Sequence, residues 1–350
     1  MLIQGVRPPH FQRLAAGRQC SEKHNSSAPC KSCRNTASYP AEYYKSFSGK
    51  YKNISFTGGQ IKDCRNLNTQ KVSDLGCRFF ELIANNSDYD IQKFLEDNIP
   101  DAVIYKSDSA KDLKQNAFAC AVCRIDSDYN CTDITLLIPD LDKNASKEEK
   151  IFYSSALAHE YTHIKQFQSG KTGRLLKNMS GGSMQYAEAV NKSAHLMFNA
   201  LEQNLTHELI TPIAGKNAAG KNNRIIIKEK PMSKEILLSG LGVKNEKEFA
   251  ELIQTYFDRL FTGLISAFKE GRSNELDLKL QAFINKILRY GLIEKLKQDV
   301  QTLCAHFAEN EMEAYAAEDT AGKKMLNIKT SSNIAAYSCF YRMLADALKN

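Results

Sequence analysis

The chain has 350 residues, of which 43% are hydrophobic, and a formal net charge of +7; this length is enough to bury a sizeable core. Its 47 basic residues are spread among 40 acidic ones without a long basic run, which argues against a nucleic-acid partner. No run of about 18 apolar residues is present, which argues against a membrane span. The first residues have Pro8, Pro9 and His10 where an export signal needs an apolar core, so we expect a cytoplasmic protein whose cysteines are mostly reduced.

Residues 1–70 are rich in Ser, Asn, Gly and Lys and show no sustained period, which predicts an irregular or disordered leader. Within it, a C-x3-H-x5-C-x2-C arrangement offers four zinc-ligand side chains close together. Two interpretations remain open for this group: a second, small zinc site or reduced thiols in an unstructured segment. Its members are Cys20, His24, Cys30 and Cys33.

The globular part follows this leader. Residues 72–98 have helical periodicity, and three short β-branched or apolar runs at 101–107, 118–126 and 132–138 predict strands. The second strand carries Cys120 and Cys123, which three-residue spacing places on opposite faces; we therefore expect core cysteines rather than metal ligands there.

A helix is predicted over residues 147–168, because Ser146 and Glu149 have the spacing of a capping box. From residue 182 onward the chain reads as mostly helical, apart from a loop at 211–234 that contains a candidate strand at 224–229. The sequence therefore predicts an α+β fold: one domain over 71–350, with a small sheet packed on the helix 147–168 in 71–170 and a larger helical lobe in 171–350.

The helix 147–168 contains the pentad H-E-x-x-H, from His159 to His163. Side chains at i and i+4 share a helix face, so both imidazoles can bind one metal ion. Glu160 lies beside them and is placed to take a proton from a water molecule that Zn²⁺ polarises. Two histidines on a solvated helix face, brought together by chance, are the alternative interpretation.

This segment resembles the active-site helix of zincin metallopeptidases. The longer metzincin form is excluded, because Gln166 and Ser169 stand where it has Gly and His. The resemblance implies a zincin-like fold and, in the gluzincin branch, a third metal ligand from a glutamate on a later helix. Asn310-Glu311-Met312-Glu313-Ala314 is similar to the Asn-Glu-x-x-small pattern of that branch. Many gluzincins place an Asp four residues after the ligand to orient a histidine; here that residue is Tyr315, so the sequence assigns no partner to the histidines.

Periodicity also selects Glu311 without the resemblance. Over residues 293–320, an apolar stripe at helical spacing contains Glu311, whereas Glu313 lies on the opposite side. A carboxylate in a buried stripe needs a metal or a counter-ion, and a lysine from another helix is the alternative partner. Glu188, on a separate helical stretch, ranks second as the third ligand and Glu313 third. The stripe consists of Leu296, Val300, Leu303, Phe307, Ala314 and Ala321.

Together these features predict a zinc-dependent metallopeptidase that acts on a peptide or protein substrate. Zn²⁺ would be held by His159, His163 and Glu311, with Glu160 as general base. The strand 132–138, if it forms the sheet's edge, would pair with the extended substrate. The rivals are a helical interaction protein with an accidental or degenerate motif and a zinc hydrolase acting on a non-peptide amide. The oligomeric state is not encoded in any pattern we find.

The sequence does not choose the group that would stabilise an oxyanion. The candidates are Tyr315, His306, His195 and Tyr161.

Overall fold

The computed structural model describes residues 2–6, 69–85, 90–100, 102–107, 119–139, 141–202, 205, 210, 232–269, 278–330 and 332–349. The candidate second zinc site at residues 20–33, nearly all of the predicted loop 211–234 and its candidate strand 224–229 lie outside these residues. The described elements are β1 (Leu2–Val6), α2 (Thr69–Asn85), α3 (Ile91–Asn98), β2 (Val103–Ser107), β3 (Cys120–Ile125), β4 (Cys131–Pro139), α4 (Lys147–Gln168), α5 (Lys171–Ser180), α6 (Met184–Leu201), α8 (Lys234–Gly240), α9 (Glu246–Lys269), α10 (Leu278–Arg289), α11 (Ile293–Leu326) and α12 (Ile334–Lys349).

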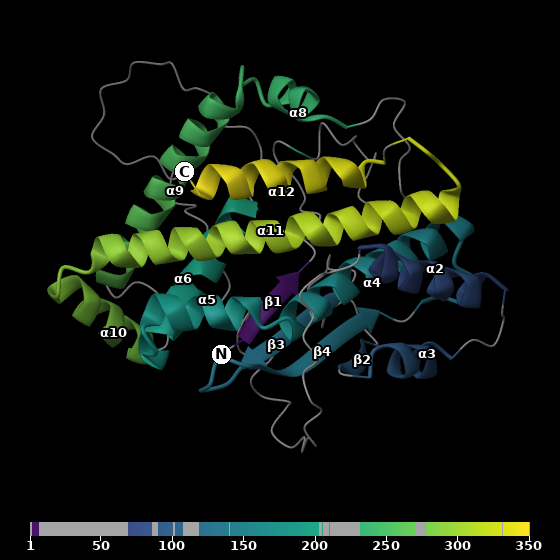
Figure 1. Cartoon of the computed structure of the whole chain (residues 1–350), viewed down its shortest axis with the longest axis horizontal. Coiled ribbons are helices and arrows are strands. Elements are labelled where there is room, and N and C mark those ends of the chain that lie inside the picture. The colour runs from purple at the N-terminus through teal and green to yellow at the C-terminus, as the bar shows by residue number, and fades with distance from the viewer. Residues whose placement is uncertain are drawn as a thin grey trace, which may run out of the picture.

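The fold is a mostly helical α+β arrangement with a small mixed sheet, as predicted. The described strands have the order β1-β3-β4-β2, in which β2 runs parallel to β4 and the other pairs are antiparallel. Helix α4 packs against β3 and β4 on one side and against α2 and α11 on others. Figure 1 shows α11 as the long helix that crosses the molecule between α12 and the sheet.

Two expectations about the sheet are wrong. Residues 132–138 belong to β4, which has β3 on one side and β2 on the other, so β4 is not an edge and has no free side for a substrate. The segment Leu2–Val6, predicted to be irregular, is a strand that pairs antiparallel with β3. The Ser-, Asn-, Gly- and Lys-rich composition of residues 1–70 favoured irregular structure, whereas the backbone hydrogen bonds of a strand are satisfied by a partner far along the chain.

Helix α4 begins where the sequence predicts it. The Ser146 side chain accepts from the Glu149 N–H, and the Glu149 carboxylate accepts from the Ser146 N–H; this capping box satisfies two otherwise unpaired donors. On its buried side, α4 lies so close to α2 that a Cβ on Gly76 would be 2.5 Å from the Ser154 carbonyl oxygen. The absence of a side chain at Gly76 therefore permits the close approach of α2 to α4.

Helix α11 spans 34 residues and ends at Leu326, about two turns after Glu318. All six residues of the predicted apolar stripe are buried, and Glu311 is 5% exposed among them. The helix continues six residues beyond the predicted end and stops at Asn327, whose φ of 53° is left-handed, a common helix ending for Asn.

The predicted core cysteine at position 123 is buried with a free thiol; the side chain of Cys120 is outside the described set. None of the described helices is long and apolar enough to cross a membrane.

Candidate metal centre

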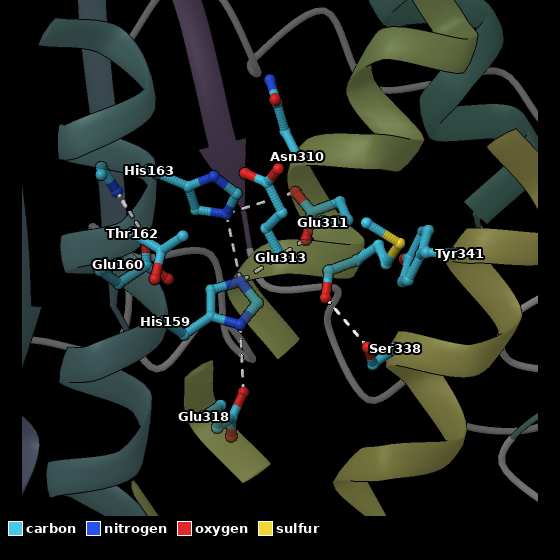
Figure 2. Close-up of polar contacts among 12 residues, drawn as sticks. His159, Glu160, Thr162, His163, Asn310, Glu311, Glu313, Glu318, Ser338 and Tyr341 are labelled. Atoms are coloured by element: carbon cyan, nitrogen blue, oxygen red, sulfur yellow. Dashed lines mark hydrogen bonds and ion pairs between the residues drawn. The ribbon is translucent and has the colours of Figure 1, made fainter. Parts of the chain in front are cut away.

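Helices α4 and α11 bring two imidazoles and one carboxylate together in the interior. The Nε2 atoms of His159 and His163 are 3.2 Å apart. Glu311 places Oε2 at 3.5 Å from the first ring nitrogen and Oε1 at 3.4 Å from the second. The three side chains are at most 5% exposed, and Figure 2 shows them pointing toward one another across the two helices.

These separations match a metal site. Tetrahedral zinc with bonds of about 2.0–2.1 Å to N and O holds its ligand atoms roughly 3.4 Å apart. The two ring nitrogens are 3.2 Å apart, and each has one Glu311 oxygen close to that spacing, Oε2 for His159 and Oε1 for His163. Within the described part of the chain, His159, His163 and Glu311 form a group that could hold a metal ion. A donor set of two imidazole nitrogens and one carboxylate suits a divalent metal ion such as zinc.

On the far side of each ring, a hydrogen bond at Nδ1 orients Nε2 of the same ring toward the shared metal position. His159 Nδ1 donates to Glu318 Oε2 at 3.1 Å, and His163 Nδ1 donates to Gln166 Oε1 at 2.9 Å. Because both acceptors are oxygen atoms, the Nδ1 positions carry protons, and each ring in its neutral form presents a lone pair at Nε2. Two lone pairs 3.2 Å apart repel unless a cation or a proton lies between them.

The charge balance also favours a cation. Glu160, Glu311 and Glu318 are all buried beside the two rings, and no lysine or arginine is buried among the described residues. The ion-pair partners of Glu311 there are the two histidines, so the alternative of a lysine partner is wrong for the described part of the chain. Carboxylates buried beside two imidazoles concentrate negative charge, which is costly in the interior unless it is paired or coordinates a metal ion.

The pKa values of the rings follow from the same surroundings. Burial alone lowers the pKa of His159, but hydrogen bonds with Glu311 and Glu318 outweigh it and raise this pKa to about 10. Burial dominates at His163 and lowers its pKa to about 4. His159 therefore favours its protonated form and His163 its neutral form. This is expected where buried carboxylates concentrate negative potential at a cation position.

Glu160 is fully buried on α4, and its Oε2 accepts from the backbone N–H of Ala121 on β3 at 2.8 Å. This hydrogen bond links the carboxylate of Glu160, the residue after His159, to the sheet. Figure 2 shows Glu160 beside His159 on the same helix.

The other candidate ligands lie elsewhere. Glu188 is half-exposed on α6 and pairs with Lys192 at 2.9 Å. Glu313 accepts from Gln166 Nε2 at 3.0 Å, and the same amide donates to the Asn310 carbonyl oxygen at 2.9 Å. Glu313 is thus linked to His163 through Gln166 and is not one of the three grouped donors.

Of the four oxyanion candidates, Tyr315 is the one whose ring packs on a ligand: it meets His159 edge-on with centroids 4.5 Å apart. His306 bonds Thr172 at 2.8 Å, His195 stacks on Phe307, and Tyr161 lies under Lys165.

Sequence reasoning missed Glu318 and Gln166. Glu318 lies seven residues, or about two turns, after Glu311, and so falls on the same helix face; it takes the orienting position that the resemblance assigned to residue 315. It also missed a buried pair, in which the Tyr341 hydroxyl donates to Glu202 Oε1 at 2.7 Å. Burial, and then the charge of Glu311, raise the pKa of Glu202 well above its usual value.

Comparison with known proteins adds no assignment: no family model, no curated protein and no solved structure matches the chain.

Proposed function

We propose that the chain is a zinc-dependent metallopeptidase of gluzincin type. The observation that carries the proposal is the buried group of two histidine nitrogens and one carboxylate whose ligand atoms lie within 4.8 Å of one another, with Glu160 next to the first histidine on the same helix. His159, His163 and Glu311 would hold the ion. When bound, zinc supplies a Lewis acid that lowers the pKa of a water molecule and polarises a carbonyl group.

The residues of the chain divide the remaining work. Glu160 takes a proton from the attacking water and then delivers it to the leaving nitrogen, the role of a general base followed by a general acid. Its bond to the Ala121 N–H fixes the carboxylate beside β3. Glu318 and Gln166 orient the two rings and increase their basicity as ligands.

The sheet beside Glu160 favours a peptide as substrate over a smaller amide. An extended chain can add to the edge of a sheet through its backbone hydrogen bonds, and β3 already accepts a separate extended segment on the side away from β4.

The test is Glu160→Gln, which removes the base but keeps the size of the side chain. We expect about one zinc per chain by elemental analysis and a loss of hydrolysis of about 10²–10⁴-fold, the usual contribution of a general base. Cleavage is followed by mass spectrometry on a mixed peptide library. Glu148→Gln, an exposed change on the same helix, is the matched control. Full hydrolysis by Glu160→Gln, or no zinc in the unsubstituted protein, contradicts the proposal.

A further inference from the structure

Strand β1 pairs with β3 at the residue of β3 that contacts Glu160. The register places Gly5 opposite Ala121 and Val6 opposite Cys120. The N–H of Ala121 is the donor that bonds the Glu160 carboxylate. In Figure 2, the purple ribbon of β1 passes behind His163. Gly5 is therefore paired with the residue whose N–H bonds the proposed base, Glu160.

The place that β1 occupies is a sheet edge. β3 has β4 on one side and β1 on the other; if β1 left, β3 would present the unpaired N–H and C=O groups that attract an extended chain. The opposite edge of the described sheet is β2, which is separated from β3 by β4. Only the β3 edge brings a paired chain to Ala121 and hence to Glu160.

The site is closed in this arrangement. His159 and Glu160 are 0% exposed, His163 is 2% exposed and Glu311 is 5% exposed. A peptide bond cannot reach side chains that are so deeply covered unless part of the covering moves.

We propose that residues 2–6 occupy the place of an extended peptide substrate and must leave β3 before a substrate enters. The inference rests on the proposed function and adds the mode of substrate binding: a chain antiparallel to β3 that passes Ala121. Because β1 is part of the same chain, it competes intramolecularly with a free peptide for β3. A free peptide at micromolar concentration would then bind poorly to the unaltered protein.

Proline at two adjacent positions provides the test and its control. In an antiparallel pair, the N–H and C=O of alternate residues point toward the neighbouring strand. Of Ile3→Pro and Gln4→Pro, one therefore removes a hydrogen bond to β3 and the other removes an N–H that points away, which an edge strand tolerates. Both variants carry the same ring constraint, and one of them alone removes a ladder bond; Ile3→Ala and Gln4→Ala control for the loss of the side chains.

The probe is a fluorescein-labelled synthetic peptide with the sequence of residues 1–8, and its binding to the full chain is followed by fluorescence polarisation. Glu160→Gln is added throughout to prevent cleavage. Hydrogen exchange of the amides in residues 119–125 is measured on the same samples. We expect one proline variant to bind the probe at least about fivefold more tightly than the parent, the effect of one backbone hydrogen bond, with faster exchange in β3. The other variant should match the parent.

Equal probe binding by the parent and both variants, or unchanged exchange in β3 for both, overturns the proposal. Neither readout requires hydrolysis. Zinc content is measured in parallel, so that a chain without zinc contradicts the proposed function while the binding and exchange results still decide the role of β1.

Discussion

Glu318 offers the sharpest prediction about the metal centre, because its Oε2 accepts the Nδ1 proton of His159 at 3.1 Å. The carboxylate is fully buried, so solvent does not screen its charge. Replacing an orienting partner of a metal-bound histidine usually weakens metal binding by about 10–100-fold, or about 1.4–2.7 kcal/mol. Glu318→Gln keeps an acceptor oxygen and removes only the charge, so we expect a loss near tenfold. Glu318→Ala removes both and should approach a hundredfold.

The assay is competition for zinc against a chromophoric chelator at fixed pH. Glu294→Gln is the control, because it makes the same charge change at an exposed position of the same helix. His163→Ala should lose zinc altogether. If Glu318→Gln and Glu318→Ala both bind zinc within about threefold of the unsubstituted protein, the carboxylate does not support the metal site and our account of the His159 ring is wrong.

Three further predictions concern buried groups around the centre. Tyr341→Phe leaves the buried Glu202 carboxyl without its donor and should lower the free energy of unfolding by about 1–3 kcal/mol, measured by urea titration; no change would refute the pairing. Burial and then the charge of Glu311 raise the pKa of Glu202, so the neutral carboxyl stabilises the metal-free protein at low pH and this stability is lost as the pH rises toward that pKa. Glu202→Gln should therefore be more stable than the parent at pH 8. Equal stability at pH 8 counts against this reasoning. Burial lowers the pKa of His195 to about 4, so its contribution is present above pH 6.5 and is lost as the pH falls from 6.5 to 4; His195→Phe, which keeps a ring against Phe307, should lose less stability over that range than the parent, and identical pH curves would contradict it.

Local patterns were sufficient for the helices of the site. Ser146 and Glu149 predicted the start of α4, because a capping box is formed within four consecutive residues. The apolar stripe of α11 predicted that Glu311 is buried, because helical period alone fixes which face a residue occupies. These two inferences also placed the pentad and the third donor on helices that pack together.

Long-range pairing was not predictable in the same way. The hydrophobic run of β4 reads equally well as an inner or an edge strand, and only the parallel pairing with β2 decides between them. Strand β1 precedes a long polar stretch and pairs with β3, more than 110 residues later in the chain. Gln166 follows the pentad on α4 and has nothing in its identity to indicate that it bridges His163 to Glu313.

Glu318 was within reach of sequence reasoning. It lies on the same face as Glu311 two turns later, but the expectation of an orienting residue four positions after the ligand drew attention to Tyr315 instead. At that position a tyrosine ring packs on His159, and the carboxylate that bonds the ring comes from the next turn.

X-ray absorption at the zinc edge of the purified protein tests the central claim most directly. We predict about one zinc per chain with two imidazole nitrogens and one or two oxygens at about 2.0–2.2 Å, and loss of this signal in His163→Ala and Glu311→Gln. Protein that carries no zinc after reconstitution, or zinc whose ligand shell is unchanged by both substitutions, would contradict a metal site at the meeting point of α4 and α11.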